Sequence, residues 1–397
     1  MGIGEARAAT RIKTVADARR LAHRRLPGPV WDYIEGGAGA ETTLRANINA
    51  YELVHFLPRV GAVTGDSPDL STSVLGTPVS MPLLLSPVGF TRMMDPAGDL
   101  AAVGAAGAAG TLATLSSMSG HTITEVAAAA TGPAWFQLYF LGGRAGAEQL
   151  VDRAQQAGYR ALVVTLDTPM PGNRERDSRH GLSPPLRLDR RTITKMAPRV
   201  LPHPRWLVDA ARDRFSLDLI NTTSLELGGK TMTSLEALLH WLAYPAKWED
   251  FGWLREQWDG PILAKGVLTA DDARRAIDVG ADGVVVSNHG GRQLDSVDAT
   301  IAALARVVGA VDGRVEVYLD GGVRRGADVV KAVALGAKAA MVGRAWAYGL
   351  AAAGRPGIDR VLRLLREDID RTMRLVGATN IAEIDRSLVR TPPEWGP

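Results

Sequence analysis

The 397-residue chain contains no cysteine, which removes several classes of site from consideration. Without a thiol it can form no disulfide, zinc–thiolate centre, iron–sulfur cluster or cysteine nucleophile. Aromatic residues make up only 6% of the chain, whereas glycine occurs 43 times. Its chemistry must therefore rest on other side chains, and glycine turns are expected to be frequent.

The chain also lacks a strong excess of charge and a convincing membrane span. Its 46 Lys+Arg and 43 Asp+Glu leave a formal net charge of +3, too weak to indicate nucleic-acid binding. The longest uncharged run, residues 100–120, is mostly Ala, Gly, Ser and Thr. Such a run is a poor transmembrane segment. The first residues carry charges where a signal peptide has its apolar core, so we expect a cytoplasmic protein.

Eight short apolar runs recur between residues 82 and 344, and helical stretches separate most of them. The runs are continuously apolar and rich in Val and Leu, which is typical of strands buried on both faces. They are PLLLSPV, TLATLS, AWFQLYF, ALVVTLD, PILAKG, DGVVVSN, VEVYLDGG and KAAMVGR. Several of the alanine-rich stretches end in glycine, a usual helix stop. The pattern predicts an α/β fold, a TIM (β/α)8 barrel.

The same pattern predicts how the chain is divided. The parts are an N-terminal helical cap and lead-in, the barrel, and a C-terminal tail: residues 1–80, 81–377 and 378–397. Residues 15–26 and 41–53 have helical periodicity, and we expect them to cap the bottom of the barrel or to cover one side. Residues 168–247, after strand 4, form an insertion too long for a loop and a helix, which predicts a lid, a binding surface or a disordered segment.

Polar residues follow six of the predicted strands, at the end of the barrel where TIM barrels carry their chemistry. His289 lies between Asn288 and two glycines, which leave open space above the imidazole ring. Asp167 ends a strand two positions away in the barrel, so its carboxylate could orient and charge the ring. This pair indicates acid–base chemistry.

Two arginines accompany this pair in sequence. Arg292 follows the His289 glycines, and Arg174 follows Asp167 in the PGNRERD segment. Two guanidinium groups near one histidine are typical of a carboxylate clamp. For Arg174, a loop salt bridge with Glu175 or Asp177 is an equal alternative.

Buried lysine and glycine–arginine turns point to an anionic ligand. Lys265 closes an apolar strand, where a cation needs an anionic partner; Schiff-base chemistry and stabilisation of an anionic cofactor ring are both open. Asp320-Gly321-Gly322 followed by Arg324, and Gly343-Arg344, end strands 7 and 8. A phosphate site after these strands is common in TIM barrels. The alternative for each turn is an ordinary glycine turn with a surface arginine.

Several segments carry a resemblance to a known family, the FMN-dependent L-2-hydroxy-acid oxidases and dehydrogenases. The resemblance runs from about Asp17 to about Ser387, and SNHGGRQLD from Ser287 is its most specific part. DGGVRRGADVVKAVALGA is nearly as specific, and WDYIEGGAGAETTLRANINAYE, WFQLY, TLDTP, AKGV and VGRA agree in the same order. The flavin is implied by this resemblance alone.

The resemblance implies a role for each site residue. His289 is the active-site base with Asp167 as partner, Arg174 and Arg292 hold the substrate carboxylate, and Tyr33 and Tyr139 hydrogen-bond the substrate. Residues implied to contact FMN are Pro87, Val88, Gly89, Ser116, Gln137, Thr165, Lys265, Ser287, Asp320, Gly321, Gly322, Val323, Arg324, Gly343 and Arg344. No metal site is implied.

The implied reaction converts a 2-hydroxy acid to the 2-oxo acid, after which a second substrate reoxidises FMN. His289 takes the hydroxyl proton if the C2 hydrogen leaves with its electron pair, or the C2 proton if a carbanion forms first. Quinone and dioxygen are both open as acceptors, and an oxidase would release hydrogen peroxide. An FMN-containing barrel isomerase and a flavin-binding protein without turnover are alternatives from other classes.

Details within the family favour the L-lactate and mandelate dehydrogenase branch. Gly89 stands where several oxidases carry Ala, and Met118 where glycolate oxidase has Trp. TLDTPMPGNRERD and WEDFGWLREQWDGPILAKG are similar to the lactate dehydrogenases. Enzymes of redox-cofactor maturation that act on peptide-derived substrates are also similar, but they depart from the HGGR signature that this chain keeps.

The insertion is locally basic. From Arg174 to Arg214 there are 11 Lys+Arg and 5 Asp+Glu, and Trp206, Leu207 and Phe215 lie among the arginines. A segment resting on an anionic membrane surface has this composition, and so does a solvated lid or a subunit contact. We therefore expect peripheral contact with the inner face of the cell membrane as one option, and the family resemblance implies a homotetramer.

Overall fold

Eight parallel strands close into a barrel in the computed structural model, which describes residues 3–62, 67–179, 197–213, 220–223, 225–227 and 230–396. The barrel strands in order are β4 (Leu83–Leu85), β5 (Ala113–Ser116), β6 (Ala134–Leu138), β7 (Leu162–Thr165), β10 (Ile262–Val267), β11 (Gly283–Val286), β12 (Glu316–Leu319) and β13 (Ala339–Val342). Seven lie within one of the eight apolar runs and β10 extends one residue beyond its run, so the predicted TIM barrel is confirmed.

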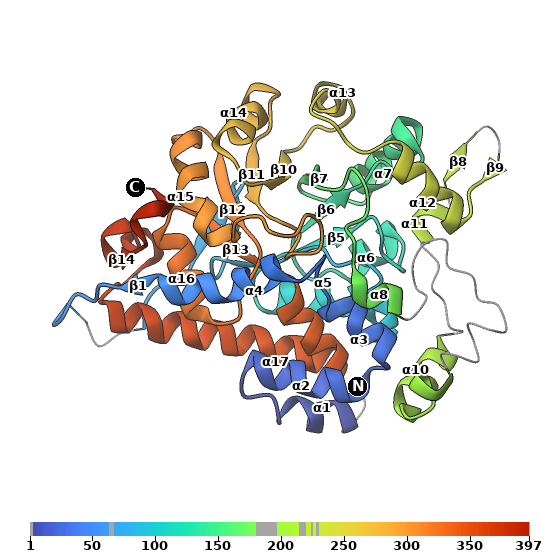
Figure 1. Cartoon of the computed structure of the whole chain (residues 1–397), viewed down its shortest axis with the longest axis horizontal. Helices are drawn as coiled ribbons and strands as arrows, with labels where there is room; N and C mark the ends of the chain where they lie inside the picture. The colour runs from blue at the N-terminus through green and yellow to red at the C-terminus, as the bar shows by residue number, and fades with distance from the viewer. Residues whose placement is uncertain are drawn as a thin grey trace.

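Helices surround the barrel, as Figure 1 shows. The helices that follow barrel strands are α5 (Gly98–Ala108), α6 (Ile123–Ala129), α7 (Gly143–Gln156), α13 (Asp250–Gln257), α14 (Ala270–Asp278), α15 (Thr300–Val311), α16 (Gly326–Ala334) and α17 (Arg344–Val376). The strands alternate between two apolar environments: Leu83 and Leu85 pack outward against the helices, whereas Leu84 points into the barrel. Both strand faces are buried, as the continuous apolar runs predicted.

The N-terminal segment contacts the barrel along one side, on α17, and at both ends of the strands. α1 (Ile3–Ala9) and α2 (Val15–Arg25) pack against α17. The hairpin of β2 (Thr72–Val74) and β3 (Thr77–Val79) closes the amino end of the barrel, where Val74 and Val79 join the interior core. α3 (Gly28–Glu35) and α4 (Thr42–Asn49), with the 3₁₀ turn Ala50–Leu53, reach the carboxyl ends of the strands.

The C-terminal part of the chain is tied to the N-terminal part. α17 bends at Ala353 and Gly354, where Gly354 has a φ of +59°, and continues alongside α2. Beyond it, β14 (Val389–Arg390) pairs antiparallel with β1 (His55–Phe56). The segment predicted as a tail therefore takes part in a two-stranded sheet.

The insertion is described only in part. Its described elements are α8 (Glu175–Arg179), α10 (Pro204–Arg212), α11 (Ile220–Thr223), β8 (Glu226–Leu227), β9 (Lys230–Thr231) and α12 (Ser234–Ala243). Phe215 and Arg214, which contributed to the predicted basic surface, lie outside the described residues. α10 is held to the body of the protein, because Arg25 pairs with Asp209 at 2.9 Å and Arg92 pairs with Asp213. None of the helices in the described ranges combines the length and apolarity needed to cross a bilayer.

Candidate active site

The predicted polar residues meet at the carboxyl ends of the strands. His289 and Asp167 follow β11 and β7, and the His289 Nδ1 lies 3.1 Å from an Asp167 carboxylate oxygen. On the other side of the ring, His289 Nε2 lies 3.5 Å from the hydroxyl of Tyr139, which follows β6. The pair predicted from sequence is therefore formed, and Nε2 is the ring nitrogen that faces Tyr139 rather than Asp167.

Burial and charge set the protonation of this pair. Burial lowers the pKa of His289 below its ordinary value, and the Asp167 carboxylate opposes that effect only in part. Burial opposes ionisation of Asp167, but the protonated form of His289, present at the low pH where Asp167 titrates, and the charge of Lys265 hold the pKa of this carboxyl below its usual range. A neutral imidazole beside a fixed carboxylate is the arrangement of a general base.

The backbone at His289 is unusual. Its φ is +59°, and the following Gly290 and Gly291 have φ of +65° and +75°. A left-handed conformation at a residue with a Cβ is uncommon and costs free energy, so the surrounding structure must hold it. Asn288 and the buried Asn47 of α4 do so through reciprocal side-chain hydrogen bonds. Sequence analysis missed Asn47, since no local motif links it to a loop more than two hundred residues away.

Two guanidinium groups lie around one tyrosine ring. Arg292 stands 4.8 Å and Arg174 stands 5.9 Å from the centroid of Tyr33, which comes from α3. Arg292 also donates to the backbone carbonyls of Tyr33 and Gly36. Burial, reinforced by the charge of Arg174, lowers the pKa of Arg292 to about 9, so it stays charged at neutral pH. Within the described ranges it has no carboxylate ion-pair partner, and a ligand carboxylate would supply one.

Arg174 forms the predicted loop salt bridge and is still placed where the predicted carboxylate clamp would need it. Its Nε lies 3.4 Å from a carboxylate oxygen of Asp177, which is the predicted loop salt bridge. The same side chain faces Tyr33 and remains 24% exposed, so it can also meet a ligand.

Lys265 is buried at the end of β10 among polar groups. Its Nζ donates to the Ser287 hydroxyl at 3.0 Å and lies 3.4 Å from an Asp320 carboxylate oxygen. Burial works against the charged form, but Asp320 and Asp167 raise the pKa of Lys265 above its ordinary value. A lysine held protonated is a poor Schiff-base nucleophile, so the structure favours the electrostatic role over that alternative.

A chain of neutral polar side chains continues from this lysine around the barrel. The Ser116 hydroxyl donates to Gln137 at 3.0 Å, and the Gln137 amide donates to Thr165 at 3.0 Å. Pro87, Val88 and Gly89 follow β4 beside them. A Cβ placed on Gly89 would lie 3.0 Å from the Cβ of Met118 and 3.7 Å from the Tyr33 hydroxyl. The absence of a side chain at position 89 is therefore explained in part by the close approach of Met118.

The glycine turns after β12 and β13 provide a cradle. Gly321 and Gly322 have φ of +96° and +85°, and a Cβ on Gly322 would lie 1.9 Å from the Asn47 carbonyl oxygen. The carboxylate of Asp328 accepts the N–H groups of Arg324 and Arg325, so the start of α16 is already capped. No side chain caps the start of α17 at Gly343, which leaves that helix terminus for a phosphate.

The predicted phosphate arginines differ in their surroundings. Arg344 donates from all three of its nitrogens to the carbonyls of Ile34, Gly36 and Gly290, which leaves two of its five N–H groups for a ligand. Arg324 lies over the Tyr348 ring and donates to the carbonyl of Val323.

Orphaned polar atoms test whether a flavin nucleotide fits here. Asp320 Oδ1 and, beside Gly343, Ser86 Oγ are buried without a hydrogen-bond partner in the described structure. Buried unpaired acceptors are costly, and hydroxyl groups of a bound ribityl chain would satisfy them. Together with the cradle and Lys265, these atoms fit FMN. The described residues contain no group of three or more His, Asp or Glu placed to bind a metal.

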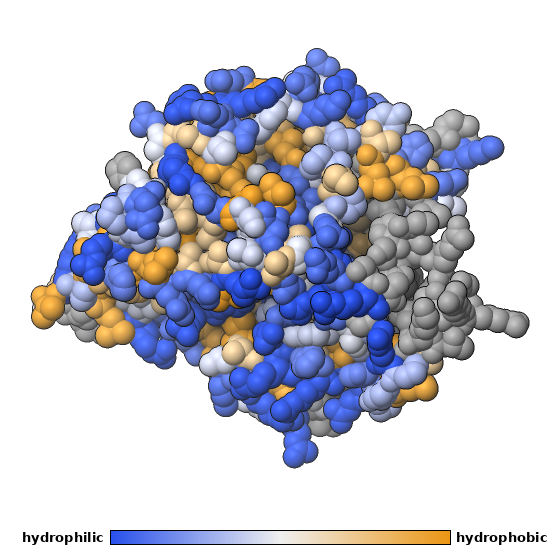
Figure 2. All heavy atoms as spheres, in the orientation of Figure 1, coloured by the Kyte–Doolittle hydropathy of each residue, from blue (hydrophilic) through white to orange (hydrophobic). Residues whose placement is uncertain are grey.

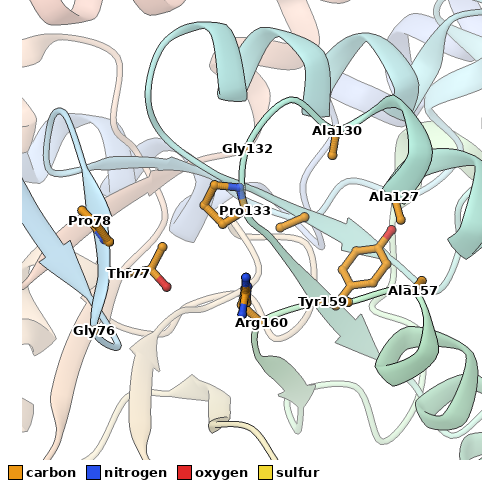
Figure 3. A pocket seen from close by; sticks show the side chains of 12 residues that line it. Gly76, Thr77, Pro78, Ala127, Ala130, Gly132, Pro133, Ala157, Tyr159 and Arg160 are labelled. Carbon is orange, nitrogen blue, oxygen red and sulfur yellow. The ribbon is translucent and has the colours of Figure 1, made fainter.

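The opposite end of the barrel has a cavity of different character. It has a volume of about 570 Å³ and lies between the β2–β3 turn and the loops that lead into β6 and β7 (Figure 3). Among its lining residues only Tyr159 and Arg160 are titratable. Tyr159 donates to the carbonyl of Ile123 and so serves packing. The groups that can do chemistry lie at the carboxyl ends.

A TIM barrel with a half-buried histidine–aspartate pair, two clustered arginines and a glycine-rich cradle fits one class of protein, a flavin-dependent oxidoreductase. The model of the FMN-dependent dehydrogenase family matches residues 22–391. The chain therefore belongs to this family and is an FMN-dependent enzyme, as the sequence predicted.

Similar proteins span almost the whole chain. An L-lactate dehydrogenase of Alcaligenes faecalis is 42% identical over 388 residues, which cover 96% of this chain and all of that protein. A pre-mycofactocin synthase of Mycobacterium tuberculosis is 41% identical and covers 96% of this chain and 95% of its own length. A crystal structure of monotopic membrane protein (S)-mandelate dehydrogenase superposes with a TM-score of 0.88, 38% identity and coverage of 96% and 100%.

Proposed function

We propose that this enzyme oxidises a small L-2-hydroxy acid of lactate or mandelate type to the 2-oxo acid. The observation that carries the proposal is the facing arrangement of His289 Nε2, the Tyr139 hydroxyl and the two guanidinium groups around Tyr33. Acid–base groups that lie close to carboxylate-binding groups suit a substrate whose hydroxyl is on the carbon next to its carboxylate.

Each proposed substrate contact follows from this geometry. Arg292 and Arg174 bind the carboxylate, which relieves the buried positive charge of Arg292. Tyr33 and Tyr139 donate to substrate oxygens. His289 accepts at Nε2 a proton from the substrate, and Asp167 stabilises the imidazolium through Nδ1. The proton comes from the substrate hydroxyl in one route and from C2 in the other. In both routes His289 Nε2 is the atom that accepts it.

The proposed cofactor contacts divide between the ring and the phosphate. When bound, FMN supplies a two-electron acceptor for the substrate carbon. Residues proposed to hold its ring and ribityl chain are Pro87, Val88, Gly89, Ser116, Gln137, Thr165, Lys265, Ser287 and Asp320. Residues proposed to hold its phosphate end are Gly321, Gly322, Val323, Arg324, Gly343 and Arg344. Lys265, kept protonated by Asp320, offsets negative charge on the ring.

The proposal includes a quinone as acceptor, a homotetramer and peripheral contact with the inner face of the cell membrane. The neighbouring mandelate dehydrogenase is described as a monotopic membrane protein, which supports the last point. Of the three apolar residues predicted for such contact, Trp206 packs against the core and donates to the carbonyl of Met93 at 2.7 Å, Leu207 is half-buried, and Phe215 lies outside the described residues. Leu201 and Val208 are 67% and 48% exposed, and Figure 2 shows apolar surface over α12, which carries the exposed Leu239.

A second candidate rests on the pre-mycofactocin synthase, whose identity to this chain nearly equals that of the lactate dehydrogenase. In that case the substrate would be peptide-derived rather than a small free 2-hydroxy acid. Arg292 favours the first candidate, since a peptide-derived substrate without a carboxylate next to the reacting carbon needs no such clamp.

Anaerobic mixing of the FMN-loaded enzyme with a panel of L-2-hydroxy acids tests the main proposal. We expect L-lactate or L-mandelate to bleach the flavin absorbance, and the D-enantiomers to leave it unchanged. Failure of every acid in the panel to reduce the flavin would contradict the proposed substrate class and favour the second candidate.

Two further measurements test the acceptor and the membrane contact. Steady-state turnover should be faster with a soluble quinone than with dioxygen, and the opposite order would make the enzyme an oxidase. Sedimentation with anionic vesicles should fall in Leu201→Glu. The control Leu375→Glu changes a leucine of similar exposure, 70%, on the far part of α17 and should leave sedimentation unchanged.

A further inference from the structure

We propose that Asn47 is a positioning residue that fastens an N-terminal strap, residues 33–47, to both the loop of His289 and the glycine turn after β12. One side chain would thereby set the base and the phosphate end of the cofactor site relative to each other. The proposal rests on the roles proposed above for His289 and for the glycine turn.

The strap crosses the carboxyl ends of the strands and is bonded to loops on both sides. The Gly39 N–H donates to the Asn173 carbonyl at 2.8 Å, and the Ala38 N–H donates to the Gly291 carbonyl at 2.8 Å. In return, strap carbonyls accept hydrogen bonds from the buried guanidinium groups of Arg292 and Arg344. The strap is thus a wall of the site.

At the C-terminal end of the strap, Asn47 forms a reciprocal pair of side-chain hydrogen bonds with Asn288. It is 1% exposed, and its Nδ2 donates to Asn288 Oδ1 at 2.8 Å. Asn288 Nδ2 donates back to Asn47 Oδ1 at 2.9 Å, and the same oxygen accepts the Thr300 N–H at 3.2 Å. Because each amide both donates and accepts, the orientation of one fixes that of the other.

The His289 loop depends on the orientation of Asn288. Asn288 Oδ1 also accepts the Gly291 N–H at 3.1 Å, which closes the turn across His289 and Gly290. All three residues of that turn, 289–291, have positive φ. A Cβ on Gly291 would lie 2.6 Å from the Leu44 nitrogen, so α4 also presses directly on the turn. Asn288 Nδ2 also donates to the Asp298 carbonyl at 3.0 Å, so without Asn47 the turn would lose one of the two side-chain and backbone partners that orient Asn288, together with the donor to its Oδ1.

The same residue abuts the cofactor cradle from the other side. The Asn47 carbonyl occupies the position where a side chain on Gly322 would lie, and its Nδ2 lies 3.4 Å from where a Cβ on Gly321 would lie. The Gly321 carbonyl accepts from the hydroxyl groups of Thr300 and Tyr51, which flank Asn47. A shift of α4 would therefore move the cradle together with the His289 loop.

A double-mutant cycle on the FMN-loaded protein tests this role. Asn47→Ala should raise the FMN dissociation constant and slow flavin reduction by saturating L-2-hydroxy acid, each by about tenfold, the value of one buried hydrogen bond. Asn288→Ala should slow reduction similarly with less effect on FMN. The double variant should be no slower than the slower single variant, because both act through one pair.

A matched control separates positioning from general destabilisation. Asn221 is 2% exposed and bonds to the backbone of Ile123 and His121, away from the His289 loop. Asn221→Ala should lower the thermal midpoint as Asn47→Ala does, with the FMN dissociation constant and reduction rate unchanged. The proposal is overturned if Asn47→Ala lowers only the thermal midpoint, or if its effect on reduction adds to that of Asn288→Ala.

A second variant and a second measurement cover the cases in which the first test fails. Should Asn47→Ala not fold, Asn47→Asp keeps the shape and the bond from Thr300 but cannot donate to Asn288, and it should give the same pair of losses. Should no L-2-hydroxy acid reduce the parent enzyme, the proposed function fails. The FMN dissociation constants of the Asn47 variants would still support or overturn the link to the cradle.

Discussion

At the amino ends of the barrel strands the interior is filled mainly by apolar side chains and by Trp135, whose Nε1 has no partner in the described structure, whereas buried charges gather at the carboxyl ends. At the amino end Trp135 and Tyr318 meet edge to face with ring centroids 5.3 Å apart, closed off by Val74 and Val79 of the hairpin. At the carboxyl ends stand Lys265 of β10, Asp320 after β12 and the left-handed His289 after β11.

The two ends of the barrel therefore contribute differently to the free energy of folding. Close apolar packing at one end contributes free energy of folding, while the other end keeps groups whose burial costs it. Variants at the two ends should therefore separate stability from activity, and four predictions follow this division from the largest effect to the smallest.

His289→Gln should slow flavin reduction by about 10²–10⁴-fold, because a general base acting in the transition state contributes that much. FMN content should stay at the parent value, since His289 does not touch the proposed phosphate cradle. Anaerobic stopped-flow absorbance measures the rate. If His289→Gln reduced the flavin at nearly the parent rate, His289 would not be the general base.

Trp135→Ala should lower the free energy of unfolding by about 3–5 kcal/mol, the usual cost of emptying a large buried aromatic site. Trp135 is fully buried in the amino half of the barrel. Denaturant unfolding measures the loss, with Trp135→Phe as the graded control. The comparison between the ends breaks down if the folded variant keeps its stability but loses flavin reduction.

Asp99→Asn should stabilise the protein at neutral pH. Asp99 is buried in α5, accepts from the hydroxyls of Thr91 and Ser119, and burial raises its pKa to about 6. The folded state therefore binds this proton more tightly than the unfolded state, so its stabilising contribution is full below the unfolded pKa of 3.8 and is lost as pH rises through about 6. The resulting penalty at pH 7 is about 3 kcal/mol.

The measurement is the free energy of unfolding of the parent and of Asp99→Asn between pH 4 and pH 7. The two curves should nearly meet at the acidic end and separate at neutral pH. As a control, Asp271→Asn changes an aspartate whose side chain is 94% exposed and pairs only with the surface Arg274, and it should leave the free energy of unfolding close to the parent value. A constant difference between parent and Asp99→Asn would contradict the raised pKa.

Asp167→Asn should shift the pH dependence of flavin reduction. The Asp167 carboxylate raises the pKa of His289 against the larger effect of burial, so its removal lowers that pKa further. The acid limb of kcat/KM should move to lower pH, and the plateau should fall by about tenfold because a weaker base is left. An acid limb that stays in place would mean that another group titrates.

Much of the barrel and of the catalytic centre could be predicted from local sequence. The apolar runs revealed the strands, and the residue after each run marked His289, Asp167 and Lys265, since parallel strands end on one face. The strap could not be predicted in this way. Asn47 is an ordinary residue of a short helix, and its importance comes only from a partner in β11's loop that folding brings beside it.

The direction of surface side chains could also not be predicted from local sequence. The composition around Trp206 suggested an outward apolar face, but the ring packs inward because its N–H has an acceptor in Met93. Composition records which side chains are present, whereas their direction depends on the neighbours that the rest of the chain supplies.

The pairing of the two ends of the chain has a consequence for biosynthesis. α2 packs on α17, β1 pairs with β14, and Arg344 binds carbonyls of the strap. During translation the residues of α2 and of the strap leave the ribosome long before these partners exist. They must wait unpaired while the eight strands are made, so the wall of the active site can be completed only when the last helix of the barrel has emerged.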